Sequence, residues 1–365
     1  MYNVGKLDEA IDCFDRAIKL NPSYTEAWIY KGDILNEQSK YDEAINVFEE
    51  ALRIEPTKAR AWINKGLSLY NLAKNEDAIR CFDMAIEQDP QFAEAWIQKG
   101  NILLAQKKEN LAMECFDRAI KESPSYIETW CAKGIALNDL GKYDEAIKCF
   151  DEALTIDSES FAARFNKGVA FDALGKCDEA IQIYDEAIKI NPQLSEGLAS
   201  FKGVALCHLS KYDEAIKAYD EAIRLDPNDA NTWSNKGVAL YHLSKYDEAI
   251  KACDEAIKVD PKYADAWSIK GLALDNQGKY DEAIKAHDEA IRLDPNDANT
   301  WSNKGVALYH LSKYDEAIKA YDEAIRLDPN GADAWNNKGD ALKGLGRATE
   351  ADAAFTRAKE LEYAV

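Results

Sequence analysis

The sequence predicts an all-α fold, a solenoid built from about ten stacked helical hairpins. One observation is a duplication: NDANTWSNKGVALYHLSKYDEAIKA occurs at residues 228–252 and again at 296–320. Another is the spacing of the nine prolines, which recur every 34 residues with one 35-residue step and one missing proline. Repetition at a fixed period of 20 to 50 residues is typical of solenoids. The two copies lie 68 residues apart, which is two periods, so whole units were repeated with their phase kept.

Other residue types follow the same period when the proline slot is numbered as position 32 of each unit. Glycine stands at position 8, and alanine at positions 20 and 27, in every unit that contains them. Position 24 is mostly aromatic. All eight tryptophans stand at position 4: Trp28, Trp62, Trp96, Trp130, Trp233, Trp267, Trp301 and Trp335.

This periodicity indicates two amphipathic helices in each unit, called helix A and helix B below. On a helix, positions 4, 8 and 11 share one narrow sector, so Trp233, Gly237 and Leu240 are predicted to form a buried stripe. Positions 20, 24 and 27 do the same for helix B. Glycine or serine at position 15 indicates the end of helix A, and proline at position 32 the end of helix B. We therefore expect the tryptophans to be structural residues.

With these motifs the sequence resembles the tetratricopeptide repeat family, whose 34-residue unit carries W-x2-L-G-x2-Y, A-x3-F, alanine and proline. Lysine replaces the family's leucine at position 7, Leu or Phe replaces its tyrosine at position 11, and Arg164 and Leu198 replace two tryptophans. The resemblance implies a right-handed α-solenoid, or superhelix, with a concave groove lined by the A helices. The expected parts of this single solenoid are a partial repeat at 1–24 and repeats at 25–58, 59–92, 93–126, 127–160, 161–194, 195–229, 230–263, 264–297, 298–331 and 332–365.

The repeat at 195–229 is irregular, because it is one residue longer than the others and carries Gly197 inside helix A. Residues 195–203 are interpreted either as a hinge or as a local bulge. The chain begins partway through a helix A and ends without a polar capping helix, although solenoids normally need such caps. We expect either a fragment of a longer protein or ends that associate with another copy.

Composition excludes several classes of function. The net charge of −21 would repel a phosphate backbone, so nucleic-acid binding is not expected. No apolar run is long enough for membrane insertion, and the N-terminus lacks a signal-peptide pattern. The eight cysteines form no C-x-x-C motif and read as small core residues in a reducing compartment, which favours the cytoplasm.

Lysine occupies position 7 in all ten units, from Lys31 to Lys338. Its aliphatic stem is suited to cover apolar surface while the ammonium reaches either solvent or an acidic neighbour. A residue required in every unit is interpreted as structural.

The candidate binding surface lies opposite the buried stripe, at positions 2, 6, 9 and 13 of helix A, which would face the groove. Asparagine recurs at position 6, where a carboxamide both donates to and accepts from an extended peptide backbone. Aromatic residues and histidines stand nearby, and Ile29, Ile63 and Ile97 are expected on the flank of the groove. The predicted ligand-binding residues are Asn64, Asn166, Asn235, Asn303, Asn337, Tyr241, His242, Tyr309, His310, Asp265, Asp333 and Asp340.

The charge of this surface predicts the kind of ligand. Outside the irregular repeat it carries Arg60 alone against nine acids: Glu26, Asp33, Glu37, Glu94, Glu128, Asp139, Asp265, Asp333 and Asp340. Complementary charge favours a protein or peptide segment that is basic or neutral.

No catalytic function, cofactor or metal is predicted. The sequence has no phosphate-binding loop and no nucleophile arrangement, and His208 and His242 are expected ~10 Å apart, too far to share one metal ion. The favoured reading is a non-catalytic scaffold that binds a protein segment in its groove. The alternatives are a structural solenoid that self-assembles through its uncapped ends and, more weakly, the targeting region of a larger enzyme.

Overall fold

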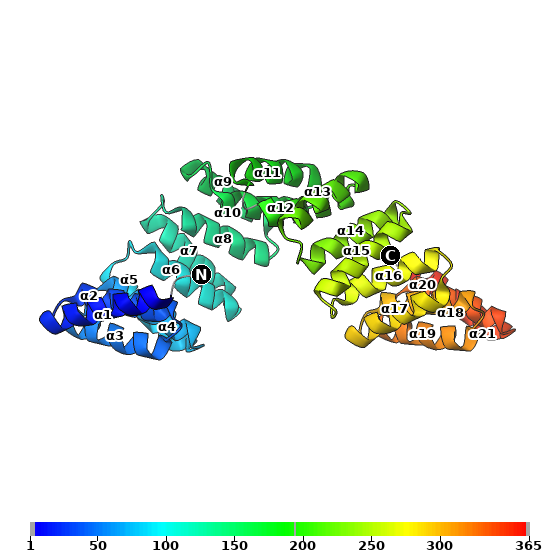
Figure 1. The fold of residues 1–365 in the computed structure, drawn as a ribbon, viewed down its shortest axis with the longest axis horizontal. Coiled ribbons are helices and arrows are strands. Elements are labelled where there is room, and N and C mark those ends of the chain that lie inside the picture. Colours follow the sequence, from blue (N-terminus) through cyan, green and yellow to red (C-terminus); the bar gives the residue numbers. More distant parts are fainter. Residues whose placement is uncertain (1–3, 193–194, 363–365) are drawn as a thin grey trace. The chain divides into compact units, whose positions relative to one another are not determined.

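The computed structural model describes residues 4–192 and 195–362, and within these ranges the regular structure is helical, without strands. The predicted uncapped ends at residues 1–3 and 363–365 lie outside the described residues. The helices shown in Figure 1 are α1 (Val4–Leu20), α2 (Thr25–Glu37), α3 (Tyr41–Ile54), α4 (Ala59–Asn71), α5 (Asn75–Gln88), α6 (Ala93–Ala105), α7 (Glu109–Glu122), α8 (Ile127–Asp139), α9 (Tyr143–Ile156), α10 (Phe161–Ala173), α11 (Cys177–Ile190), α12 (Ser195–His208), α13 (Tyr212–Leu225), α14 (Ala230–His242), α15 (Tyr246–Val259), α16 (Ala264–Asn276), α17 (Tyr280–Leu293), α18 (Ala298–His310), α19 (Tyr314–Leu327), α20 (Ala332–Gly344) and α21 (Ala348–Glu362).

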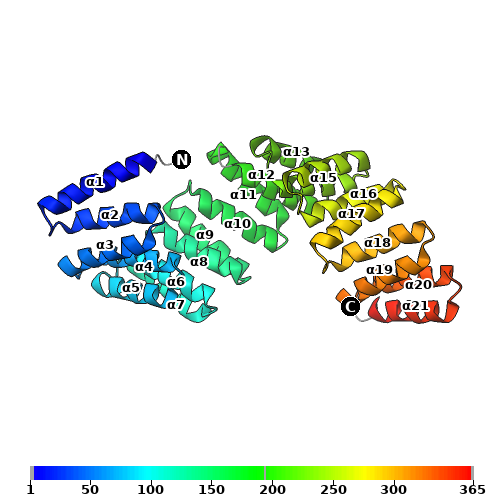
Figure 2. The ribbon, with the colours of Figure 1, turned by 60° about the horizontal axis from the view of Figure 1, so that its bottom comes forward.

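The chain forms two compact units, Met1–Leu174 and Gly175–Val365, called unit 1 and unit 2 below. Within each unit, successive helices lie side by side and run in alternating directions (Figure 2). The even-numbered helices are the A helices of the repeats, and the odd-numbered helices are the B helices. The all-α solenoid of helical hairpins that the sequence predicted is therefore confirmed.

Most hairpins are closed by a contact between the glycine at position 8 and a ring at position 24; in the repeat at 230–263, Gly237 instead faces Cys253. Phe82 is completely buried, and a Cβ atom added to Gly66 would lie 2.7 Å from its ring. Gly305 has the same relation to Tyr321, at 2.5 Å. Such a distance is far inside van der Waals contact, so the two helices approach this closely only because position 8 has no side chain.

The tryptophans join one repeat to the preceding turn and pack against the core from its edge, as Trp62 does. The indole Nε1–H of Trp62 donates to the carbonyl oxygen of Pro56 at 2.9 Å. All eight tryptophans make this bond to the proline six residues earlier, at 2.9 to 3.4 Å. The predicted buried stripe is therefore wrong in one respect: Gly66 and Leu69 are buried, whereas Trp62 is only half-buried.

The lysine at position 7 makes a second joint between repeats. Its ammonium pairs with an acid at position 25 of the preceding helix B, at 2.5 to 2.8 Å in all ten repeats. The pairs are Lys31–Asp15, Lys65–Glu49, Lys99–Asp83, Lys133–Asp117, Lys167–Asp151, Lys202–Asp185, Lys236–Asp220, Lys270–Asp254, Lys304–Asp288 and Lys338–Asp322. In five repeats the ammonium also lies over the tryptophan ring of its own helix. The structural interpretation of these lysines agrees with this geometry.

Helix A ends in every repeat with a residue in the left-handed backbone region. Glycine occupies this place at Gly141, Gly175, Gly278 and Gly346. In the other repeats the residue has a side chain: Ser39, Ala73, Lys107, Ser210, Ser244 and Ser312, with φ between 56° and 60°. A β-carbon destabilises this conformation by about 1 kcal/mol, so six repeats hold a small local strain at the turn.

The irregular repeat absorbs its extra residue in helix A. The other A helices have 13 residues, and α12 has 14. It runs through Gly197 without a break to His208. Residues 193 and 194, directly before this stretch, lie outside the described residues, and the hinge at 195–203 stays a prediction.

The turn geometry predicts that Ala73→Gly raises the free energy of unfolding by about 1 kcal/mol, because glycine removes the Cβ clash at a positive φ. The reverse change, Gly141→Ala, serves as the control and is expected to lower it by a similar amount. Urea unfolding followed by circular dichroism measures both. Equal signs for the two variants would contradict the interpretation.

The second joint predicts a coupling free energy of about 0.5 to 1 kcal/mol between Lys304 and Asp288 in a double-mutant cycle with alanine. Because the Asp288 side chain is 50% exposed, salt should screen the pair, and the coupling should shrink in 1 M NaCl. A coupling that is absent, or unchanged by salt, would show that the pair adds nothing to the repeat interface.

Candidate functional site

The surface formed by positions 2, 6, 9 and 13 of the A helices is called the helix-A face below. Among the described residues none of these positions is buried: each is either half-buried or exposed. The candidate site residues are therefore within reach of a ligand. Their local partners differ between the two units.

In unit 1 the predicted asparagines are engaged within the protein. Asn64 Nδ2 donates to Asp33 Oδ1 at 2.5 Å, and Arg60 pairs with the other oxygen of the same carboxylate at 2.8 Å. The Arg60 guanidinium also lies 4.9 Å from the centre of the Tyr30 ring. Burial raises the pKa of Asp33, although Arg60 and Asn64 act to lower it. Asn166 donates to the carbonyl oxygen of Ala162 at 2.9 Å in its own helix.

In unit 2 the asparagines at position 6 are held differently. Asn235 on α14 donates to Asn231 Oδ1 at 2.8 Å, and Asn231 in turn donates to the Tyr263 hydroxyl at 2.9 Å. Asn303 on α18 and Asn337 on α20 are half-buried, and neither side chain forms a hydrogen bond to another residue of the described chain. Their carboxamides keep both donor and acceptor capacity.

The histidines at position 13 pack on the preceding repeat. The His242 ring stacks on Tyr212, the first residue of α13, with centroids 4.8 Å apart and planes 10° apart. His310 repeats this arrangement on Tyr280 at 4.7 Å and 9°. The sequence analysis missed this pairing. Its signal was a tyrosine at position 17 of one repeat followed by a histidine at position 13 of the next repeat. One face of each imidazole is already occupied.

The tyrosines at position 12 belong to the same edge of the repeats. The Tyr241 hydroxyl accepts a hydrogen bond from Asn276 Nδ2 at 3.1 Å, and its ring lies 5.7 Å from Tyr246. Tyr309 and Tyr314 form the equivalent pair at 5.4 Å. These residues gather near the A–B turns, at the end of the helix-A face.

The isoleucines predicted on the flank of the groove do not reach the surface. Ile29 and Ile63 are completely buried, and Ile97 is 8% exposed. This prediction was wrong because position 5 of helix A packs into the core between neighbouring repeats, as Ile29 does beside Ala61 of the next helix A. A helical wheel places a residue around its own axis and takes no account of where the next repeat packs.

The acidic excess of the helix-A face is reduced but persists. Asp33 is paired with Arg60, and Glu26 is paired with Lys58 at 2.6 Å. Burial also raises the pKa of Glu94. In the described chain the remaining seven acids form no ion pair: Glu37, Glu94, Glu128, Asp139, Asp265, Asp333 and Asp340.

Two cavities differ in what surrounds them. An open cavity of about 860 Å³ in unit 1 lies on the helix-A face and is lined by Tyr70, Asn101, Leu104, Ala105, Lys107, Glu109, Ala132, Ile135, Ala136, Asp139 and Leu140. Among these lining residues, the sequence analysis had named only Asp139, because of its charge.

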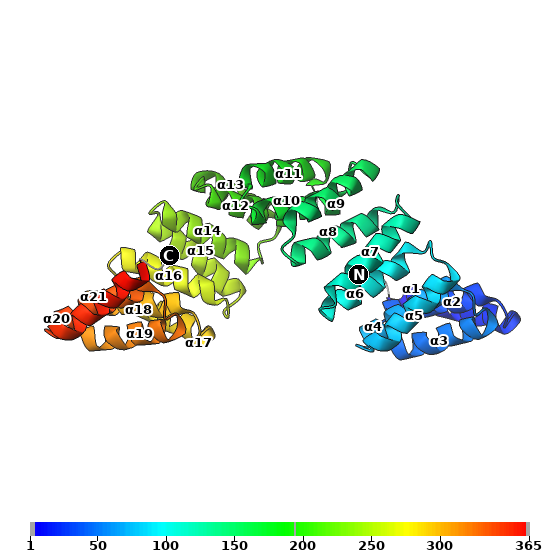
Figure 3. The same cartoon turned by 180° about the vertical axis from the view of Figure 1, so that it is seen from behind.

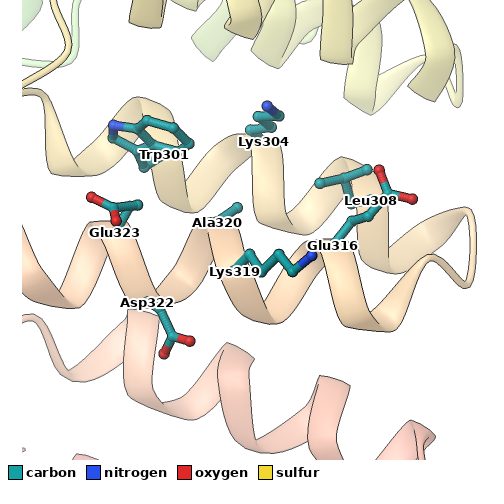
Figure 4. Close-up of a pocket in the computed structure, with 8 residues that line it drawn as sticks. All are labelled: Trp301, Lys304, Leu308, Glu316, Lys319, Ala320, Asp322 and Glu323. Atoms are coloured by element: carbon teal, nitrogen blue, oxygen red, sulfur yellow. The ribbon is translucent and has the colours of Figure 1, made fainter.

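A cavity of about 630 Å³ in unit 2 lies between Trp301, Lys304 and Leu308 of α18 and the side chains of α19 that face them (Figure 4). Because Lys304 also forms the joint to Asp288, this second cavity belongs to the packing of the repeats.

No helix among the described residues is both long and apolar enough to cross a bilayer.

The cysteines at position 23 of helix B are buried and form no disulfide: Cys81, Cys115 and Cys149. Burial raises the pKa of Cys81 and of Cys115 to about 11 and that of Cys253 to about 12. These thiols therefore stay protonated and unreactive near neutral pH.

Comparison with known families gives one consistent answer. Models described as "Tetratricopeptide repeat" or "TPR repeat" match residues 2–59, 35–96, 93–126, 131–195, 203–244, 230–263, 264–297, 298–330 and 320–353. Together these matches span far more than half of the chain. No curated protein sequence matches it.

One solved structure shows a similar fold, and two others match about half of the chain. The Cut9 and Hcn1 hetero-tetramer of the APC/C matches at 19% identity over 90% of this chain and 80% of that chain, with a TM-score of 0.55. MamA matches at 28% identity over 44% of this chain and 94% of that chain, with a TM-score of 0.41. YrrB, described as a TPR protein with an unusual peptide-binding site, matches at 21% identity over 51% and 95%, with a TM-score of 0.42.

The stacked rings predict that His242→Ala lowers the free energy of unfolding by about 0.5 to 1.5 kcal/mol. Tyr212→Ala removes the same contact, so the losses in the double variant should be less than additive. Urea unfolding of the two single variants and the double variant measures the coupling. Strict additivity would mean that the stack does not stabilise the repeat interface.

Proposed function

The chain belongs to the tetratricopeptide repeat family, and we propose that it is a non-catalytic scaffold whose helix-A face binds an extended segment of a partner protein. Membership of this family supports a role in protein interaction. The binding mode is argued below from the residues of unit 2.

The main support for the proposal is that the side-chain amides of Asn303 and Asn337 form no hydrogen bonds within the described chain. Both lie at position 6 of neighbouring A helices, where each is half-buried and without a hydrogen-bonding partner in the described chain. A half-buried amide without a partner loses part of its hydration, so a ligand that satisfies it gains free energy. An extended backbone offers N–H and C=O groups alternately. It can therefore donate to the oxygen of each carboxamide and accept from its NH2 group.

The spacing of the A helices suits such a ligand. Neighbouring A helices lie on the order of 10 Å apart, which an extended chain covers in about three residues at ~3.3 Å each. A segment of about nine residues would therefore reach from Asn235 across Asn303 to Asn337, because α14 and α20 are three helix spacings apart. Asn235 contributes mainly its acceptor oxygen, because its amide already donates to Asn231.

Charge supports a basic or neutral partner. Asp265, Asp333 and Asp340 stand beside these asparagines, are exposed and form no ion pair within the described chain. Lysine or arginine side chains of a ligand would neutralise them, whereas an acidic segment would be repelled. Such rim charges act mainly on the association rate and on specificity.

We also infer that the protein works in a reducing compartment such as the cytoplasm. Cys81, Cys115, Cys149 and Cys253 are buried as small core residues and form no disulfides. An oxidising compartment favours cysteines that are paired.

The proposal predicts that changing Asn235, Asn303 and Asn337 together to Ala weakens partner capture at least tenfold, because each carboxamide contributes on the order of 1 kcal/mol. The measurement is affinity capture from native lysate with quantitative mass spectrometry. Circular dichroism should show equal helix content in both forms.

A matched control changes three exposed lysines on B helices of unit 2, Lys251, Lys285 and Lys319, to Ala. This variant should retain the captured proteins. If the asparagine variant retains them equally well, the asparagines do not form the binding surface. If only further copies of this chain are captured, the scaffold proposal gives way to self-assembly.

A further inference from the structure

The helix-A face of unit 1 carries a cavity that the asparagine row of unit 2 does not explain. It spans three successive A helices, with Tyr70 on α4, Leu104 on α6 and Ile135 on α8. Figure 3 labels these three helices in unit 1. Its volume of about 860 Å³ lies within the range of ~300 to 1,000 Å³ typical of ligand sites. The cavity is therefore large enough to hold several residues of a partner.

A stacking contact that occurs in unit 2 is missing from this part of the chain. In two repeats of unit 2 a histidine at position 13 stacks on the tyrosine at position 17 of the preceding repeat, His242 on Tyr212 and His310 on Tyr280. In the repeat at 93–126, position 13 is Ala105 and the preceding position 17 is Asn75. In the next repeat the corresponding residues are Asp139 and Glu109, so rings are absent from both places.

The floor of the cavity exposes large apolar side chains. Tyr70 is 45% exposed and Ile135 is 40% exposed, although most large apolar residues of the chain are at least half-buried. Leu104, Ala105 and Ala132 extend the same floor. A ligand that covers this floor with a bulky apolar side chain removes apolar surface from water, which is the main source of binding free energy.

The rim of the cavity carries an acidic excess. Glu109 and Asp139 line it together, and neither forms an ion pair in the described part of the chain. Lys107 is the cation among its lining residues. Glu94 and Glu128, at position 2 of α6 and α8, add further negative charge to the same helices. A ligand therefore needs cationic groups beside its apolar anchor.

We propose that this cavity binds a partner segment in which a bulky apolar side chain is flanked by lysine or arginine. The inference rests on the proposed scaffold function and assigns to unit 1 a second, chemically different subsite: an apolar anchor in place of backbone recognition by asparagine. The net charge of −21 makes a second copy of this chain a poor complement for an acidic rim. A heterologous basic segment fits the cavity better.

The first test is selection from a random dodecapeptide phage library on the full chain. The selected peptides should be enriched in Leu, Ile, Phe or Trp next to Lys or Arg. The peptide bound most strongly is then measured by fluorescence anisotropy against the wild type and against variants. Selection of acidic peptides, or of peptides without apolar residues, would overturn the proposal.

The variants separate the two features of the cavity. Ile135→Ser should weaken binding of that peptide about tenfold, as loss of a central apolar anchor does. Glu109→Gln with Asp139→Asn should weaken it several-fold at low salt and reduce its salt dependence. Ile156→Ser changes an equally exposed isoleucine at the end of α9, a B helix outside the helix-A face; it is the matched control and should leave the affinity unchanged. Equal affinity of Ile135→Ser and wild type would overturn the assignment.

Further outcomes distinguish this inference from the scaffold proposal. Peptides that lose affinity in the asparagine variant but not in Ile135→Ser would leave the scaffold standing and overturn the unit 1 site. Failure to select any peptide would count against both. Sedimentation at rising protein concentration tests whether a second copy of this chain fills the cavity instead. A dimer that dissociates in the Ile135→Ser variant would show that it does.

Discussion

The joint between a helix A and the preceding helix B is the constraint on which the remaining structure depends. A single hairpin leaves one face of each helix uncovered, so stability requires a defined contact with the neighbouring repeat. Here that contact combines the tryptophan bond to the proline carbonyl with the pair between lysine and the acid at position 25. An apolar residue at position 7 would bury comparable surface. The lysine in addition restricts the rotation of helix A, because its ammonium must meet one particular carboxylate.

This joint determines which residues remain available for binding. The packing positions of helix A are the same residue type in almost every repeat because they meet the same partners each time. Positions 2, 6, 9 and 13 take no part in the tryptophan and lysine joints and differ from repeat to repeat. The two units therefore share one scaffold and present different surfaces: asparagines with exposed acids in unit 2, and an apolar cavity with an acidic rim in unit 1.

Much of the fold was predictable because it depends on contacts at a fixed sequence distance. The helical hairpins, the end of helix A at position 15 and the acidic neighbour of the position 7 lysine all follow from residues within one period. The errors concern how far a side chain is covered by its neighbours in space. Ile63 looked accessible on a helical wheel but is buried between repeats, and Trp62 looked buried in its hairpin but reaches the preceding turn. The stack of His242 on Tyr212 was missed for the same reason.

The duplicated segment shows where sequence information ends. Periodicity alone was sufficient to predict the helical hairpins and the acidic character of the helix-A face, since each depends on residue type and spacing. The state of each asparagine depends on its neighbours in space. Asn235 and Asn303 lie in identical sequence, yet Asn235 belongs to a chain of hydrogen bonds that ends at Tyr263, whereas Gly331 occupies the corresponding position beyond Asn303. A hydroxyl present in one turn and absent from the other decides whether the same amide is satisfied internally or left for a ligand.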